Sequence, residues 1–170
     1  GNPFGEPPLK FREELIKAIN DSTPGKHSYM PNCGYNETRE EIAKVLKEEY
    51  GLPFTLNHVV MSCGAAGGIN VVLKTLLEPE DEVIVLVPYF MEYAFYIKNH
   101  GGVVIEVPTK ENFQLDIDAL DKSIGIKTKA LIINSPNNPT GIIYKEEILK
   151  EFSELIRVKE KEVGHPIYVS

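Results

Sequence analysis

Short apolar runs alternate with amphipathic stretches from residue 58 to residue 170. The runs are rich in Val, Ile and Leu and lack polar alternation, so they predict strands that are buried on both faces. They are HVVMSCG (58–64), DEVIVLVPYF (81–90), GGVVIEVPT (101–109), KALIINSPNNPTG (129–141) and PIYVS (166–170). Helical spacing predicts helices between them, over about 65–77, 91–100, 116–125 and 145–163. This alternation indicates an α/β fold with three layers, α/β/α, around a mostly parallel sheet.

The residues before the first predicted strand follow a different pattern. Apolar side chains recur at helical spacing in residues 10–20 and 37–50, and Gly51 is a typical helix stop. A loop rich in Gly, Pro, Asn and Ser separates these two predicted helices. We therefore interpret residues 1–36 as an N-terminal helix and loop segment, and residues 37–170 as the first part of a larger domain.

Composition narrows the class of protein. With 170 residues, of which 42% are hydrophobic and 25% charged, the chain is long enough for one core and is not predicted to be disordered. A net charge of −7 argues against a nucleic-acid partner, and no apolar run is long enough to span a membrane. Cys33 and Cys63 have neither a CxxC spacing nor a nearby His pair, so we expect free thiols and no metal site.

Both ends of the sequence suggest a piece of a larger enzyme. The chain begins at GNPFGEPPLK without a Met, and it stops inside the strand pattern PIYVS. A buried strand needs neighbours on both sides, so further sequence is expected after it.

Three predicted strands end in unusual residues. In parallel sheets, ligands bind beyond the carboxyl ends of the strands. The first strand is followed by SCGAAGG (62–68), the second by PYF (88–90) and the fourth by NSPNNPTG (134–141). These segments are expected to meet at one edge of the sheet.

The small residues of SCGAAGG leave two interpretations open. They let a phosphate approach the backbone N–H groups of a helix start, or they permit close packing of a helix against the sheet. A dinucleotide-binding loop is disfavoured, because the spacing does not match G-x-G-x-x-G and the second strand ends in VPYF, without an acidic residue to bind a ribose hydroxyl.

The other two segments offer a ring and an amide. Phe90 either closes the core or stacks on a planar ligand. A plain turn explains Asn, Pro and Gly one by one, but not three amides and two prolines at the end of a buried strand. An amide there can donate a hydrogen bond to an anionic oxygen without adding charge, while proline fixes the backbone.

Taken together, the motifs resemble the fold-type I pyridoxal-phosphate-dependent aminotransferases of class I/II, which include aspartate aminotransferases. The resemblance covers essentially the whole chain, and NSPNNPTG is its most specific part. The matching segments, in the family's order, are GNP (1–3), SYMPNCGYNETREEIA (28–43), MSCGAAGG (61–68), DEVIVLVPYFMEY (81–93) and KALIINSPNNPTG (129–141). The resemblance implies that the chain forms the first part of the cofactor-binding large domain and that the cofactor is pyridoxal 5′-phosphate.

The resemblance also implies roles around the cofactor. Gly64, Ala65 and Ala66 would donate backbone N–H groups to its phosphate. Phe90 would stack on the pyridine ring, where many relatives have Trp. Asn138 would donate to the phenolic oxygen, which favours the ionised form of that oxygen, and would also contact the substrate.

Two further residues are assigned by the same resemblance. Tyr29 would reach the cofactor phosphate of a neighbouring subunit, and Gly1 would lie beside the substrate carboxylate. The Val87–Pro88 and Asn138–Pro139 bonds are expected to be cis. One departure is the Gly67–Gly68 pair, where relatives often have Glu-Ala.

No catalytic residue is expected within this chain. The family's Asp that pairs with the pyridine nitrogen, its Schiff-base Lys and its substrate-binding Arg would all follow Ser170. The 170 residues alone are therefore not expected to catalyse transamination.

The resemblance implies a cytoplasmic, homodimeric parent protein of amino acid metabolism and biosynthesis. It would transfer an amino group between an amino acid, by our hypothesis of aspartate type, and an α-keto acid. Alternatives on the same scaffold are a carbon–sulfur lyase and an aminocyclopropane carboxylate synthase-like enzyme. A non-catalytic cofactor-binding relative and a nucleotide-binding α/β domain are the alternatives from other classes.

The remaining polar residues have simpler interpretations. His58, His100 and His165 have no carboxylate or Cys partner at a useful spacing, so they are interpreted as structural or solvated. Arg39 lies among glutamates on a predicted helix, which favours a surface ion pair.

Overall fold

The apolar runs form a parallel sheet in the computed structural model, which describes residues 4–170. The strand order is β2-β1-β3-β4, and all the pairs are parallel. Central pairs include Val85 with Ile132 and Leu86 with Val107. The strands are β1 (Glu82–Val87), β2 (Val103–Pro108), β3 (Thr128–Ile132) and β4 (Tyr168–Val169).

The chain divides into two compact units, one that ends at Met61 and one that spans Ser62–Ser170. The boundary that we placed after residue 36 stays a prediction. Within the part of the chain that the structure describes, no helix has the length and apolar character needed to cross a membrane.

Between residues 4 and 61, the first unit contains two helices and a short 3-10 turn: α1 (Leu9–Asn20), α2 (Asn36–Tyr50) and η1 (Leu56–His58). Both predicted helices are confirmed. Gly51 ends α2 in the left-handed conformation, with φ of 67°, and its N–H donates to the carbonyl of Lys47. Glycine adopts this conformation at little cost, which is why it stops the helix.

Arg39 corrects one of our predictions. It lies on α2 but is only 8% exposed. Its Nε donates to the Val59 carbonyl and its Nη2 to the Leu56 carbonyl, each at 2.8 Å. The predicted surface ion pair is therefore wrong, because the chain after α2 brings carbonyls back to this side chain. Sequence spacing along one helix does not reveal such partners.

The strand that we predicted over residues 58–64 is also wrong. His58 ends η1 and Gly64 begins the next helix, so the residues between them belong to no strand. Val59 is extended, with φ of −117° and ψ of 123°, and the Met61 N–H donates to the Cys33 carbonyl at 3.0 Å. An apolar run becomes a strand only beside a partner strand, and here the partner is a loop carbonyl.

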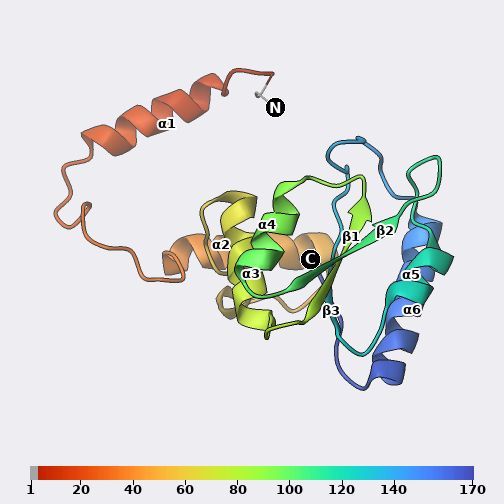
Figure 1. Ribbon diagram of the computed structural model, residues 1–170. Helices are drawn as coiled ribbons and strands as arrows, with labels where there is room; N and C mark the ends of the chain where they lie inside the picture. Colours follow the sequence, from red (N-terminus) through yellow and green to blue (C-terminus); the bar gives the residue numbers. More distant parts are fainter. Residues whose placement is uncertain (1–3) are drawn as a thin grey trace. The chain divides into compact units, whose positions relative to one another are not determined.

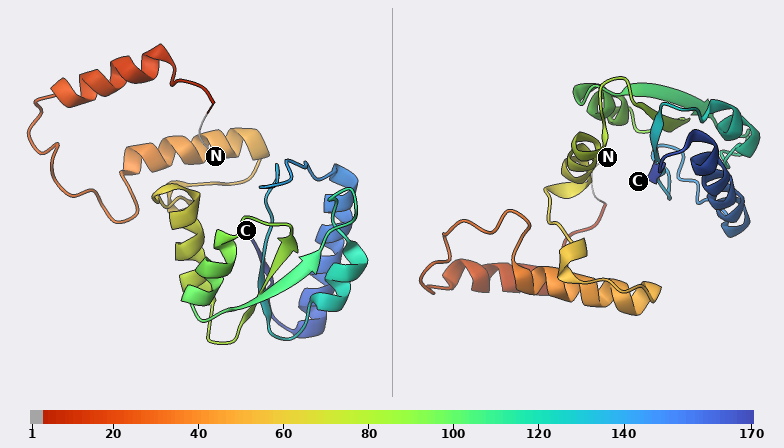
Figure 2. Two further views of the ribbon diagram at one scale, coloured as in Figure 1. Left: turned by 45° about the horizontal axis from the view of Figure 1, so that its top comes forward. Right: turned by 90° about the horizontal axis from the view of Figure 1, so that it is seen from below.

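The second unit contains the sheet and four helices. These are α3 (Gly64–Leu76), α4 (Glu92–Asn99), α5 (Ile117–Ser123) and α6 (Glu146–Val163). In Figures 1 and 2, α3 and α4 cover one face of the strands, and α5 and α6 cover the other. The predicted three-layer α/β/α architecture is confirmed for this unit.

Alternating side chains of β1 explain why both faces are buried. Val83 and Val85 pack in a cluster with Leu73 of α3 and Ile97 of α4. Ile84 and Leu86 point the opposite way, because successive residues of a strand face opposite sides of the sheet.

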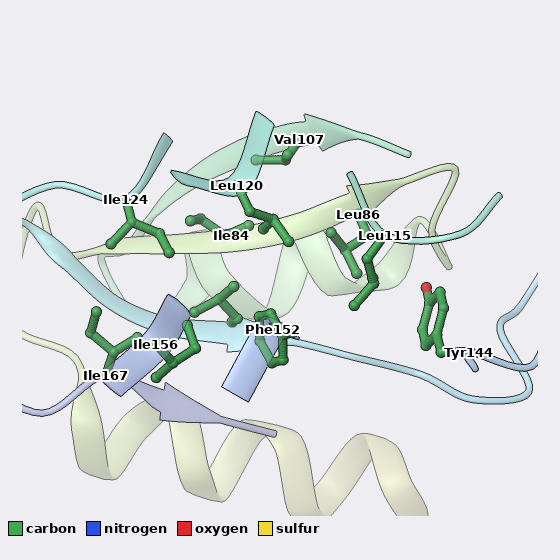
Figure 3. Packing of buried hydrophobic residues seen from close by; sticks show 11 residues of the cluster. Ile84, Leu86, Val107, Leu115, Leu120, Ile124, Tyr144, Phe152, Ile156 and Ile167 are labelled. Atoms are coloured by element: carbon green, nitrogen blue, oxygen red, sulfur yellow. The ribbon is translucent and has the colours of Figure 1, made fainter. Parts of the chain in front are cut away.

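The second of these clusters is the larger hydrophobic core. Figure 3 shows Ile84 and Leu86 of β1 facing Leu120 of α5 and Phe152 and Ile156 of α6. Burial on both faces is the physical reason that the central strands carry Val, Ile and Leu without polar alternation.

Candidate functional site

The carboxyl ends of β1 and β3 lie side by side, because these strands are parallel neighbours. Helix α3 leads into β1 through the short connection at residues 77–81 and packs on its face, so it runs back along the strand. The first turn of α3 therefore lies toward the edge where β1 ends. That turn holds Gly64, Ala65 and Ala66, all exposed.

Gly67 and Gly68 of α3 face the loop before the helix rather than the sheet. A methyl group at Gly68 would lie 3.3 Å from Ser62 Oγ, and one at Gly67 would lie 3.7 Å from Cys63 Cβ. These neighbours belong to the loop just before the helix. Close helix–sheet packing, one of the two interpretations that we left open, is therefore not what places glycine at these two positions.

Asn137 connects the loop after β3 to the end of β1. Its side chain is only 8% exposed. Its Nδ2 donates to the Pro88 carbonyl at 3.1 Å and to Thr140 Oγ1 at 2.9 Å. Both hydrogens of the amide nitrogen are therefore used within the protein.

Asn138 has the opposite surroundings. It is exposed, and among residues 4–170 its side chain has no hydrogen-bond partner. Its backbone N–H donates to Asn134 Oδ1 at 2.9 Å, which fixes the main chain at this point. Of the three amides in the motif, Asn134 and Asn137 thus hold the loop, and Asn138 keeps its amide free for a ligand.

Three cis peptide bonds shape the two strand ends. The predicted cis bonds Val87–Pro88 and Asn138–Pro139 are confirmed, and Ser135–Pro136 is a third that the sequence did not indicate.

Phe90 belongs to a small group of aromatic rings after β1. It contacts Tyr93 edge to face, with ring centroids 5.7 Å apart and planes at 81°. Tyr89 stacks on the same Tyr93 ring at 6.4 Å and 9°. Tyr89 and Tyr93 pack on the core cluster of α3 and α4, whereas Phe90 belongs to neither core cluster of the described residues and is only partly buried. This favours a ligand-facing ring over a ring that closes the core.

Glu106 anchors the same segment from β2. The Tyr89 hydroxyl donates to Glu106 Oε1 at 2.6 Å. This hydrogen bond favours the protonated hydroxyl, and burial and the negative charge of Glu106 add to the effect, which raises the pKa of Tyr89 to about 12. Tyr89 thus joins the end of β1 to the neighbouring strand.

The raised pKa leads to a pH-dependent prediction. Because the folded-state pKa of about 12 lies above the ordinary 10.0, the stabilisation from this pair is complete below pH 10.0 and is lost as the pH rises through about 12. Glu106→Gln removes the charge and should return the pKa of Tyr89 toward 10.0. Tyrosinate absorbance across pH measures this, with Tyr89→Phe to identify the signal and exposed Glu111→Gln as a matched control. An unchanged titration in Glu106→Gln would show that Glu106 does not hold this proton.

The other predicted residues have varied surroundings. Tyr29 is fully exposed in the loop between α1 and α2, and its role toward a neighbouring subunit stays a prediction. Gly1 lies outside the described residues. Cys33 and Cys63 are exposed and free, and residues 4–170 contain no group of three His, Cys, Asp or Glu placed to hold a metal ion.

The three histidines named in the sequence analysis have structural partners, as expected. His58 Nδ1 lies 3.0 Å from Thr55 N in the cap of η1. His100 Nε2 lies 3.0 Å from Asn70 Oδ1, and His165 Nε2 lies 2.9 Å from the Ile126 carbonyl.

Comparison with known sequences gives long matches to aminotransferases. The chain is 37% identical over 157 residues to a probable aspartate/prephenate aminotransferase of Thermus aquaticus, which covers 91% of this chain and 40% of that protein. It is 35% identical over 153 residues to a probable aspartate aminotransferase of Methanocaldococcus jannaschii, with 89% of this chain and 41% of that protein covered. The chain thus spans about 40% of the length of these curated relatives.

Solved structures agree with these matches. An aminotransferase from Eubacterium rectale superimposes with a TM-score of 0.95 at 37% identity, and covers 99% of this chain and 43% of that one. A Thermus thermophilus aspartate aminotransferase double mutant gives a TM-score of 0.86 at 34% identity, with 99% and 43% covered. The family model described as aminotransferase class I and II matches residues 2–163. With the fold and the strand-end motifs in the order expected, the chain belongs to the class I and II aminotransferase family.

Proposed function

We propose that this chain is part of an enzyme that uses pyridoxal 5′-phosphate to transfer an amino group between an amino acid and an α-keto acid. Family membership supports the reaction class. The aspartate aminotransferases among the relatives support a donor of aspartate type. The single observation that carries the proposal for these residues is that the free amide of Asn138 and the partly exposed ring of Phe90 lie on two strand ends that Asn137 joins.

The residues at this edge fit the cofactor. Exposed backbone at Gly64–Ala66, in the first turn of α3, suits a phosphate, because no large side chain covers it. The Gly64 N–H itself donates to the Ser62 carbonyl at 3.2 Å, so the N–H groups of Ala65 and Ala66 are the better candidates for the phosphate. The Phe90 ring suits a pyridine face, and the Asn138 amide suits the phenolic oxygen. When bound, the cofactor would supply an electron sink for the bond that breaks at the substrate α-carbon.

The residues of this chain would bind and orient rather than transfer protons. Asn138 would donate a hydrogen bond that favours the ionised phenolic oxygen. Phe90 would exclude water from one face of the ring and fix its plane. Tyr29 would reach the phosphate of a partner subunit, in a homodimer that we place in the cytoplasm.

The test is direct binding of pyridoxine 5′-phosphate to the 170-residue chain. This probe has the ring, the phenolic oxygen and the phosphate but no aldehyde, so it cannot react with lysines. The chain contains no Trp, so the fluorescence of the probe can be followed directly. Asn138→Ala is expected to weaken binding about tenfold, the value of one lost hydrogen bond to a charged group.

The matched control is Asn99→Ala, an exposed amide at the end of α4 that should leave binding unchanged. Phe90→Ala should also weaken binding, through the loss of the stacked ring. Failure of the wild-type chain to bind the probe, or equal binding by Asn138→Ala, would contradict the proposed site.

A further inference from the structure

We infer that Asn137 is a positioning residue that holds the ligand-binding amide of Asn138 at a fixed place relative to the ring of Phe90. The inference rests on the proposed function, since it concerns the same site. It assigns a role to a buried polar side chain that joins the two strand ends.

The burial of Asn137 separates its role from that of its neighbour. Its amide donors are both taken, by the Pro88 carbonyl and by Thr140 Oγ1. A ligand therefore gains no hydrogen bond from Asn137. The adjacent Asn138 is exposed and has free donors, so one residue is built into the protein and the next faces outward.

Backbone bonds close the turn around this pair. The Asn137 N–H donates to the Ile142 carbonyl at 2.9 Å, and the Asn137 carbonyl accepts from the Gly141 N–H at 2.6 Å. Thr140 Oγ1 also accepts from the Ile142 N–H at 3.3 Å. These bonds tie residues 137–142 into one turn, and the Asn137 side chain links that turn to the Pro88 carbonyl just after β1.

That link determines the geometry between the ring and the amide. Pro88, whose carbonyl receives the bond, is two residues before Phe90. Phe90 and Asn138 come from different strands, so a bond between the two strand ends sets the distance at which both can touch one flat ligand. Ligand-binding groups need to be held within roughly 0.5 Å for their full effect. Loss of the Asn137 amide should therefore weaken the hydrogen bond that Asn138 makes.

The experiment measures the phenol pKa of bound pyridoxine 5′-phosphate from its absorption spectrum across pH. Asn138 stabilises the ionised oxygen, so Asn138→Ala should raise this pKa by about one pH unit. Asn137→Ala should raise it in the same direction by about half as much, because the amide of Asn138 remains but is misplaced. Thr140→Val, which removes one acceptor of the Asn137 amide, should give a smaller rise.

The double variant separates positioning from a general effect on the fold. In the Asn138→Ala background, Asn137→Ala should cause no further change in the pKa, because the group that it positions is gone. Asn99→Ala is the control that should leave the pKa unchanged. An unshifted pKa in a folded Asn137→Ala, or an equal shift in both backgrounds, overturns the inference. If Asn137→Ala does not fold, the shift in Thr140→Val decides the question in the same way.

Failure of the proposed cofactor site can be distinguished from failure of the positioning role of Asn137. If the probe binds to no form of the chain, the cofactor site is refuted, and the positioning role is then decided without ligand. Hydrogen exchange at the backbone N–H groups of Asn138 and Gly141, which donate to Asn134 Oδ1 and to the Asn137 carbonyl, should accelerate about tenfold in Asn137→Ala if the link holds the turn. Unchanged exchange at both amides overturns the role.

Discussion

Phe152→Ala should lower the free energy of unfolding of the second unit by about 3–5 kcal/mol, the usual range for a buried Phe. Phe152 is 5% exposed and packs from α6 into the core cluster that includes Ile84 and Leu120. Truncation removes the ring and leaves a cavity that the surrounding strand and helices fill only in part. Chemical denaturation monitored by circular dichroism measures the loss.

A matched control lies on α4. Phe95 is 62% exposed, so Phe95→Ala removes the same atoms from a position that is already in contact with water. It should change the stability by no more than about 0.5 kcal/mol. Equal losses in Phe95→Ala and Phe152→Ala would show that α6 does not pack on the sheet as described.

Arg39→Met should lower the free energy that is needed to open α2 by about 3 kcal/mol. The guanidinium makes three hydrogen bonds, to the carbonyls of Val59 and Leu56 and, at 3.2 Å, to Asn36 Oδ1. Methionine keeps most of the apolar stem but leaves these acceptors without their charged donor. In Arg39→Lys the opening free energy of α2 should lie between those of the wild type and Arg39→Met. One ammonium group cannot reach three acceptors with the geometry of the planar guanidinium.

Native-state hydrogen exchange at the α2 amides measures this opening. The control is Arg12→Met on α1, where the arginine is exposed and the substitution should leave α2 unaffected. If Arg39→Met leaves exchange in α2 unchanged, the three hydrogen bonds do not hold this unit together.

The sequence predicts the sheet of the second unit because burial on both faces leaves a direct signature. A run such as VIVLV, residues 83–87, has few possible structures other than a buried strand in a chain of this composition. The run over 58–64 also contains adjacent apolar residues, but Val60 and Met61 are exposed and paired with no strand. Composition reports how well residues suit a strand, whereas pairing depends on what lies beside them.

The sequence indicates the segments of the candidate site but not the partners of each side chain, because partners depend on what lies beside a residue in the fold. The NSPNNPTG motif indicates a ligand-binding amide, but we did not predict that Asn134 and Asn137 hold the loop. The presence of three amides in one short motif is the signal that could have shown it. The sequence does not indicate which amide holds the loop and which amide is free to bind a ligand. Asn137 and Asn138 are chemically identical neighbours, and only burial and partners distinguish them. Arg39 shows the same limit, since its acceptors lie 17 and 20 residues along the chain.

The strand order β2-β1-β3-β4 determines where a ligand can enter. The chain leaves β1 through α4 on one face of the sheet and leaves β3 through α6 on the other face. Two departures in opposite directions from adjacent strands form a topological switch point, and this is the place where open α/β sheets bind their ligands. Replacement of loop residues can therefore change the chemistry at this point, while its location is determined by the winding of the chain.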